Sequence, residues 1–313
     1  MARAQGELDL MQEIAPGIYV VKPEGKPIYP YSNSVWIDDG LSLLIDVGAG
    51  SRVYQRELTR PVDIVLLSHA HFDHLHCSDL FLNSAMWAAA EEAIIYRDEA
   101  AYLSFHGYDH WNQMMGGIPR PPYGDVNPVG DDVPVKPGYR YFELAGLIED
   151  GTVFSTDRYT LRAVHLPGHT QGHYGFLIEE LNMLISGDLD FHRGGPGYYN
   201  ASGDVGELLR SIERVKRLDP ERAVPSHRGV QQGEMASKLD AYARPVLERI
   251  ERLCEYLAIP RRERDMYEIK LLFSNPAHIY EDFWNRMTML HHLEHLRAAG
   301  LVREIEPGVL QRV

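Results

Sequence analysis

The heptapeptide SHAHFDH at residues 68–74 follows directly on the run DIVLL at residues 63–67. A short apolar run of this kind predicts a buried strand, so the polar heptapeptide is expected to form the loop at its end. Imidazole and carboxylate groups are ligands that zinc, iron and manganese take in proteins. The loop therefore predicts a metal site that uses four side chains within six residues, namely His69, His71, Asp73 and His74.

Three more polar residues come directly after apolar runs in the second half of the chain. His169 lies in the motif LPGHT, Asp188 in SGD and His227 in PSHRG. Each of them, taken singly, is explained equally well as a hydrogen-bonded turn residue. Taken with the heptapeptide, they complete a site of histidines and aspartates.

The ordered series HAHFDH, PGHT, SGD and SHRG resembles the motif series of the metallo-β-lactamase superfamily and covers roughly residues 15–235. The resemblance implies an α/β (α+β) fold, a four-layer αββα sandwich with the site at one edge. It also implies two divalent metal ions, with zinc as the first expectation and iron or manganese as alternatives. By matched position, the first ion would be held by His69, His71 and His169, the second by Asp73, His74 and His227, and Asp188 would bridge them.

The same resemblance sets expectations for the reaction. The ligand set is similar to that of the glyoxalase II and lactonase branches. It differs from that of the classical lactamases, which use Cys where Asp188 stands, so the resemblance implies that a β-lactam is not the substrate. The expected activity is hydrolysis of an ester, lactone or thioester of a small molecule. Two metal ions can lower the pKa of a bridging water to about 7, which gives a hydroxide nucleophile at neutral pH. Asp73, His74 and Asp188 are the expected catalytic residues.

Candidates for a substrate pocket lie after Asp188 and in the middle of the chain. His192, Tyr198 and Tyr199 follow closely enough to line a pocket, with ordinary loop packing as the alternative. An insertion over about residues 100–150 is rich in aromatic residues, glycine and proline and lacks clear periodicity, as expected of an ordered lid. It either roofs an apolar substrate or only packs on its own domain.

The chain changes character near residue 240, which predicts two domains. Residues 1–240 alternate strands and helices, as in a layered catalytic domain. One of these helices is predicted over residues 78–97, where an apolar face at helical spacing is formed by Met86, Trp87, Ala90 and Ile94. Residues 241–313 read as helices closed by a hairpin around Pro307, and they resemble the winged-helix extension of some superfamily members.

Composition and charge limit the partners. The 313 residues are 44% hydrophobic and 24% charged, as in globular proteins generally. A formal net charge of −14 disfavours binding to nucleic acid, and the C-terminal segment carries no basic surplus. The sequence shows neither a secretory leader nor a membrane span, and only Cys77 and Cys254 are present. We expect a cytoplasmic protein with a small-molecule substrate, and a homodimer is an open alternative.

Three other functions remain open at this stage. A phosphodiesterase or ribonuclease is one, because superfamily members with the same ligands cleave RNA and the C-terminal segment resembles a nucleic-acid module. The second is an iron-dependent persulfide dioxygenase, which the ligands alone do not exclude. The third is a binding protein on a metal-free version of the fold, which the filled ligand positions disfavour. Metal identity separates the redox function from hydrolysis.

Overall fold

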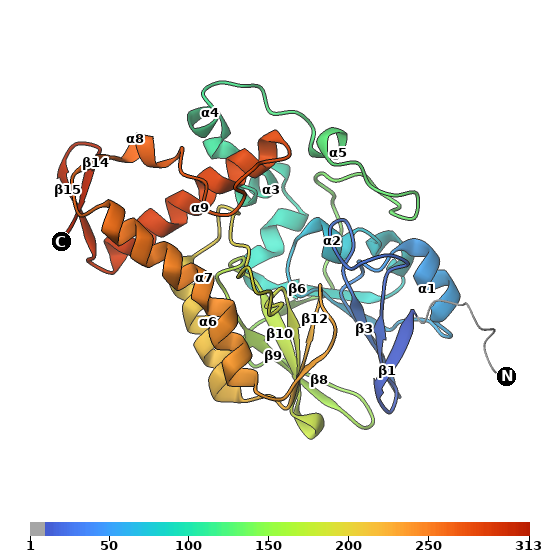
Figure 1. Ribbon diagram of the computed structural model, residues 1–313. Helices are drawn as coiled ribbons and strands as arrows, with labels where there is room; N and C mark the ends of the chain where they lie inside the picture. Colours follow the sequence, from blue (N-terminus) through green and yellow to red (C-terminus); the bar gives the residue numbers. More distant parts are fainter. Residues whose placement is uncertain (1–9) are drawn as a thin grey trace.

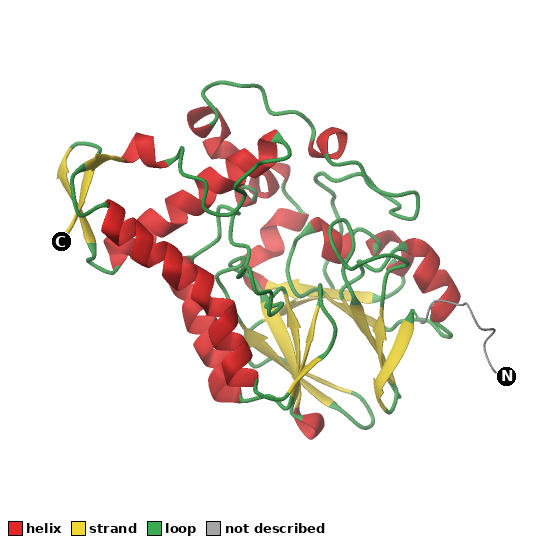
Figure 2. Cartoon of the chain, in the orientation of Figure 1, coloured by secondary structure: helices red, strands yellow, loops and turns green. Residues whose placement is uncertain are grey.

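The computed structural model describes residues 10–313, and it contains two β-sheets packed face to face with helices on their outer sides (Figures 1 and 2). The first sheet has the strand order β1-β2-β3-β4-β5-β6-β7. Strands β1 to β4 form an antiparallel meander, and β4 to β7 run parallel. The strands span Met11–Ala15, Ile18–Val21, Ser34–Asp38, Ser42–Ile45, Ile64–Leu66, Ala85–Ala89 and Gly146–Ile148.

The second sheet has the order β13-β12-β11-β10-β9-β8. Its pairs are antiparallel except for β11 and β12, which run parallel and are joined through helix α6, Val205–Leu218. A short 3-10 turn, η4, lies at Glu179–Leu181 between β10 and β11. The strands β8 to β13 span Val153–Ser155, Thr160–His165, Tyr174–Ile178, Met183–Gly187, Arg222–Pro225 and Gln231–Gln232.

Three apolar layers hold the sandwich together, and alternation along the strands produces them. In β3, Val35 and Ile37 face the second sheet, whereas Trp36 faces helix α1, Ser51–Glu57. In β11, Ile185 faces the first sheet and Leu184 faces α6. Because both faces of these strands are covered, their sequences are continuously apolar. The expected four-layer αββα sandwich is confirmed.

The prediction of a helix over residues 78–97 is wrong. This segment instead forms a 3-10 turn η1 at Ser78–Phe81, the strand β6 and a 3-10 helix η2 at Ala90–Tyr96. In β6, Met86 and Trp87 pack into different layers, as period-two alternation requires. The same apolar residues fit a helical stripe and a strand, and pairing with β5 and β7 decides for the strand.

The C-terminal segment continues from the sandwich without a break in helix α7, Met235–Tyr256. The first half of α7 packs on α6, and its second half packs into a separate apolar cluster with helix α9, Ile279–Ala298. The predicted hairpin is confirmed as β15, Val302–Glu306, and β16, Val309–Arg312. The third sheet has the order β14-β16-β15, and the remaining elements of the segment are β14 at Arg261–Arg262 and α8 at Glu263–Met266.

The insertion packs against this C-terminal segment, so the alternative that it packs only on its own domain is wrong. It contains α3 at Glu99–Phe105, η3 at Tyr108–His110, α4 at Trp111–Met114 and α5 at Tyr123–Val126. An apolar cluster joins α4 to α9, which lie side by side in Figure 1, and its buried members are Trp111, Met114, Met115, Tyr280, Phe283 and Met287. Within residues 10–313, no helix has the length and apolar character needed to cross a bilayer.

Candidate metal centre

The seven histidines and aspartates singled out in the sequence lie at one edge of the sandwich, because they follow strands that end there. The heptapeptide leaves β5 and contains the short helix α2, Phe72–Leu75. Asp188 follows β11 and His227 follows β12, and these parallel strands end at the same edge. His169 lies between β9 and β10 beside Gly168, where a Cβ atom would meet the backbone nitrogen of Leu208 at 2.3 Å. Only glycine fits there, and it lets this loop approach α6.

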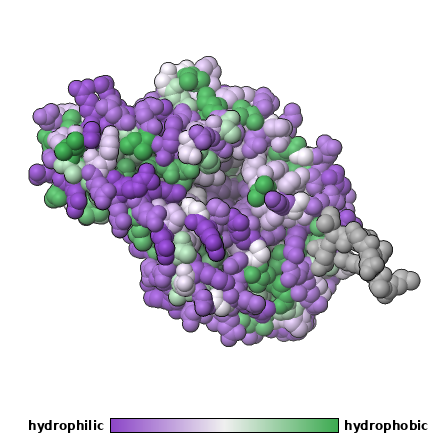
Figure 3. All heavy atoms as spheres, in the orientation of Figure 1, coloured by the Kyte–Doolittle hydropathy of each residue, from purple (hydrophilic) through white to green (hydrophobic). Residues whose placement is uncertain are grey.

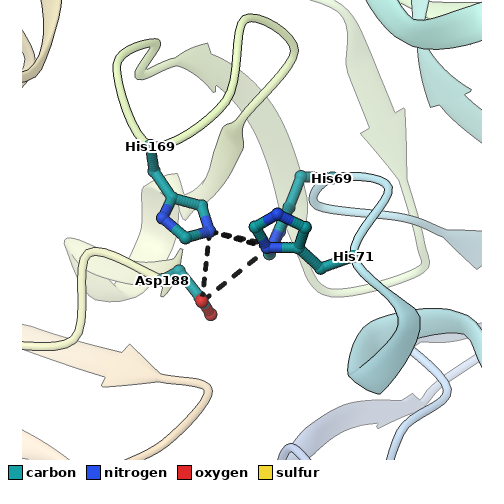
Figure 4. Close-up of side chains that lie close together, drawn as sticks. All are labelled: His69, His71, His169 and Asp188. Carbon is teal, nitrogen blue, oxygen red and sulfur yellow. Dashed lines mark hydrogen bonds and ion pairs between the residues drawn. The ribbon is translucent and has the colours of Figure 1, made fainter. Parts of the chain in front are cut away.

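The first group of side chains brings three imidazoles and one carboxylate to a point (Figure 4). His71 Nδ1 lies 2.9 Å from His69 Nε2 and 2.9 Å from His169 Nε2, and the latter two atoms are 3.2 Å apart. Asp188 Oδ2 lies 3.3 Å from His169 Nε2. The four residues offer one ligand atom each within 4.8 Å of one another.

The second group consists of Asp73, His74 and His227, and the other oxygen of Asp188 reaches it. His227 Nε2 lies 3.4 Å from Asp73 Oδ2 and 3.2 Å from Asp188 Oδ1. His74 Nε2 lies 3.0 Å from the same Oδ1 atom. Asp188 therefore stands between the groups with one oxygen toward each.

The two groups differ in charge. Burial lowers the pKa of His69 and of His71 well below the usual value, and the neighbouring histidines lower both further. Burial also opposes the charged form of His227, but Asp188 and Asp73 outweigh it and raise its pKa to about 9. The pKa of Asp188 is well below its usual range, because His227, His74 and His169 outweigh burial. Cation binding at the second group therefore displaces the proton of His227, whereas His69 and His71 of the first group offer neutral imidazoles.

These residues fit metal ions for two reasons. Three ring nitrogens that converge to about hydrogen-bond distance cannot all be satisfied by one another, because each neutral imidazole has one donor and one acceptor. In addition, His74 Nε2 and Asp188 Oδ1 are buried and have no partner of hydrogen-bond geometry among the described residues. A cation at each group would bind the converging ring nitrogens and also give His74 Nε2 and Asp188 Oδ1 a partner.

The nitrogens that face away from the groups are held by outer partners, which fix the ring orientations. His69 Nδ1 lies 3.0 Å from Ser68 Oγ and His74 Nδ1 lies 2.8 Å from Asp46 Oδ2. The outer nitrogens of His169 and His227 contact carbonyl oxygens, those of Gly197 at 2.8 Å and Pro27 at 3.0 Å. Sequence reasoning missed Asp46, although it directly follows the apolar run LSLLI and so repeats the pattern that revealed the ligands.

Glu92 is a second residue that sequence reasoning missed. It lies on η2, is 1% exposed, and joins two of the loops that carry candidate ligands. Its Oε2 accepts from the backbone N–H of Ala70 at 2.8 Å, and its Oε1 accepts from that of Gly172 at 2.9 Å. Ala70 lies between His69 and His71, so this carboxyl group sets the distance between the heptapeptide and the loop of His169.

Asn200 is the outer partner of His71, and α9 holds it in place. Its Nδ2 donates to His71 Nε2, and its carbonyl oxygen lies 2.6 Å from Nε2 of His291 on α9. If Nδ1 of His71 holds a cation, Nε2 carries the ring proton and needs an acceptor. Rotation of the Asn200 amide by half a turn supplies its Oδ1 for that purpose.

We expect Asn200→Leu to weaken metal binding about 10- to 100-fold, which is the usual cost of losing an outer partner of a ligand. Asn200→Asp keeps an oxygen acceptor and should bind metal at least as tightly as the wild type. Competition with a chromogenic chelator measures both affinities. Equal affinity in the leucine variant would show that His71 needs no partner at Nε2.

Of the three predicted pocket residues, two line a cavity in the structure and one does not. A cavity of about 810 Å³ opens over the two groups, and both His192 and Tyr199 line it. The space-filling view shows the surface hollowed between the sandwich and the C-terminal helices (Figure 3). The expectation that Tyr198 lines it needs correction. This side chain is fully buried outside the cavity, where its hydroxyl contacts His292 at 2.9 Å and accepts from Arg249 at 2.9 Å.

Comparison with known proteins identifies the family. Residues 29–227 match the family model of the metallo-beta-lactamase superfamily, and the chain belongs to this superfamily. Its members are hydrolases and typically bind metal ions. The family match ends at His227, the last of the seven residues in the chain.

Three relatives define how far the likeness extends. The lactamase-like protein nscB of Neosartorya fischeri is 33% identical over 159 residues, which are 50% of this chain and 44% of that one. The chain thus spans less than half of this relative's length. The hydroxyacylglutathione hydrolase GloC of Haemophilus influenzae is 27% identical over 191 residues, 59% of this chain and 77% of that one. A solved metallo-beta-lactamase family protein from Thermus thermophilus shares the fold over 96% of this chain and 100% of its own, with a TM-score of 0.72 and 22% identity.

Proposed function

We propose that this protein is a binuclear metal-dependent hydrolase that acts on an ester, lactone or thioester of a small molecule. The observation that supports this most is the position of Asp188, whose two oxygens face two separate groups of histidines and aspartates at the cavity. Hydroxyacylglutathione, the substrate in the name of the relative from Haemophilus influenzae, is a thioester. Zinc is the metal we expect first, with iron or manganese as alternatives.

The lining of the cavity favours water as the attacking group. Among the described residues that line it there is no serine, cysteine or lysine to act as a nucleophile. Two bound divalent ions would supply the Lewis acid and the hydroxide that such a hydrolysis needs at neutral pH. Asp73, His74 and Asp188 are the residues that we assign to this chemistry, because they place carboxylate charge and an imidazole around the second group.

We also propose the division into a catalytic domain, residues 1–240, and a winged-helix-like extension, residues 241–313. The chain order α7, β14, α8, α9, β15 and β16 supports the extension. Its lack of a basic surplus favours a role in shaping the pocket over binding to nucleic acid. A homodimer is compatible with either role.

The test is elemental analysis of protein purified without added metal, combined with assays on an ester, a lactone, a thioester and bis-p-nitrophenyl phosphate. We expect about two equivalents of zinc or manganese and turnover of the carboxyl substrates that His71→Ala abolishes. Faster cleavage of the phosphate diester would favour the phosphodiesterase. One equivalent of iron with oxygen uptake on a persulfide would overturn the hydrolase in favour of the dioxygenase.

A further inference from the structure

The wall of the cavity beyond the metal centre is rich in aromatic residues, and they come from four separate parts of the chain. Tyr199 stacks on Trp284 of α9, with ring centroids 4.7 Å apart. Trp284 is also 5.9 Å from Tyr123 of the insertion, which in turn packs edge-on to Tyr29 at 5.4 Å. These rings present flat apolar faces and edges around a volume that suits a drug-sized molecule. A short acyl group would leave most of this volume empty.

A ladder of parallel rings leads from the metal centre along this wall. The ring of His106 stacks on that of His71 at 6.4 Å, and Tyr108 stacks on His106 at 5.6 Å. The guanidinium carbon of Arg120 lies over the Tyr108 ring at 4.0 Å. All four residues line the cavity. The wall therefore begins at a candidate ligand, continues as flat rings and ends at a positive charge.

Arg120 is exposed at the cavity and has no carboxylate partner. It stacks on Tyr108 and donates to the hydroxyl of Tyr280 at 3.4 Å, and within residues 10–313 no carboxylate forms an ion pair with it. Elsewhere on the wall, Glu281 and Asp190 accept backbone hydrogen bonds, and the Glu99 carboxylate lines the cavity without pairing with Arg120. A guanidinium that lies over a tyrosine ring on a cavity wall and has no carboxylate partner is suited to bind an anionic group.

We propose that this wall binds the acyl part of the substrate, and that this part is a planar aromatic or conjugated group with a negatively charged substituent at the end far from the scissile carbonyl. The proposal rests on the proposed hydrolase function. In the reaction, the oxygen of water bonds to the carbonyl carbon, the C–S or C–O bond breaks, and the released thiol or alcohol takes up the proton. The aromatic part lies along the edges of the His106 and Tyr108 rings, whose faces already stack on their neighbours, and its charged end pairs with Arg120.

The experiment compares three thioesters of N-acetylcysteamine, carrying acetyl, 2-naphthoyl and 6-carboxy-2-naphthoyl groups, on the metal-loaded full chain. We expect kcat/KM to rise in that order. Arg120→Gln should lower the ratio of the carboxynaphthoyl to the naphthoyl value about tenfold, which corresponds to one charge-assisted hydrogen bond. Trp284→Ala should lower both naphthoyl values relative to acetyl by about two- to tenfold. Arg97→Gln, an exposed arginine outside the cavity wall, is the matched control and should leave these ratios unchanged.

Calorimetric binding of naphthalene-2,6-dicarboxylate and 2-naphthoate separates the substrate class from the function. Tighter binding of the dicarboxylate that is lost in Arg120→Gln supports the proposal, even if no thioester is hydrolysed and the hydrolase function fails. Equal kcat/KM for the acetyl and both naphthoyl thioesters, with activity that His71→Ala abolishes, would overturn the aromatic substrate and leave the hydrolase standing.

Discussion

Replacement of Asp188 by asparagine is expected to reduce kcat/KM for ester or thioester hydrolysis by at least about a hundredfold. Loss of an outer partner of a metal ligand already costs up to about a hundredfold, and Asp188 is itself a candidate ligand. The carboxylate directs one oxygen toward each group, with Oδ2 at 3.3 Å from His169 and Oδ1 at 3.2 Å from His227. An amide of the same size keeps the packing but removes the negative charge that the surrounding histidines stabilise. Asp188→Asn should therefore lower both the metal content of the protein and the rate of hydrolysis.

The matched control for this variant is Asp131→Asn. Asp131 is an exposed aspartate that belongs to neither group and does not line the cavity. It should retain most of the metal and most of the activity. Kinetics, elemental analysis and circular dichroism are measured on both proteins. An Asp188→Asn protein that is folded, binds two metal ions and is fully active would show that the bridging role is wrong.

Glu92→Ala is expected to lower the free energy of unfolding by about 2–6 kcal/mol, since two buried backbone N–H groups lose their acceptor at about 1–3 kcal/mol each. Burial raises the pKa of this carboxyl group from 4.5 to about 7. The group therefore favours the folded state most below pH 4.5, and that contribution is lost as the pH rises through about 7. The destabilisation should accordingly be larger at pH 5 than at pH 8.

Urea titration of wild type and variant at both pH values measures this effect. Glu91→Ala is the matched control, because Glu91 is exposed, precedes Glu92 directly and holds no backbone N–H among the described residues. Its carboxylate accepts from the Tyr174 hydroxyl at 3.2 Å and lies 3.8 Å from His165 Nε2. Glu91→Ala should lower the free energy of unfolding far less than Glu92→Ala does. A Glu92→Ala protein as stable as the control would mean that the loops of Ala70 and Gly172 hold their positions without this carboxyl group.

The candidate ligands could be found from the sequence because their pattern is local. Each lies shortly after a strand, on a loop or, for Asp73 and His74, on the short helix α2. Parallel strands such as β11 and β12 bring such residues to one edge of the sheet. The layered fold could be predicted for the same reason, since continuous apolar runs indicate strands covered on both faces. The heptapeptide by itself carries four possible metal ligands within six residues, which is more than an ordinary turn needs.

The residues that hold the ligands were harder to find, because their roles depend on tertiary contacts. Asn200 reaches His71 across more than a hundred residues, and nothing in its local sequence indicates that contact. Strand β6 has the composition of a helix, and only its neighbours in the sheet decide otherwise. Tyr198 and Tyr199 are adjacent in sequence, yet one is buried against Arg249 and the other faces the cavity. Their side chains point to opposite sides of an irregular segment.

The cluster that joins α4 to α9 also affects how the chain is made. Trp111 and Met114 leave the ribosome long before Phe283 and Met287, so their apolar faces lack α9 as a partner during most of synthesis. The cluster is complete only when α9 arrives, and until then part of its apolar surface is exposed. A chimera that takes its C-terminal segment from a relative would have to take the insertion from that relative as well, because the apolar sides of the two segments cover each other.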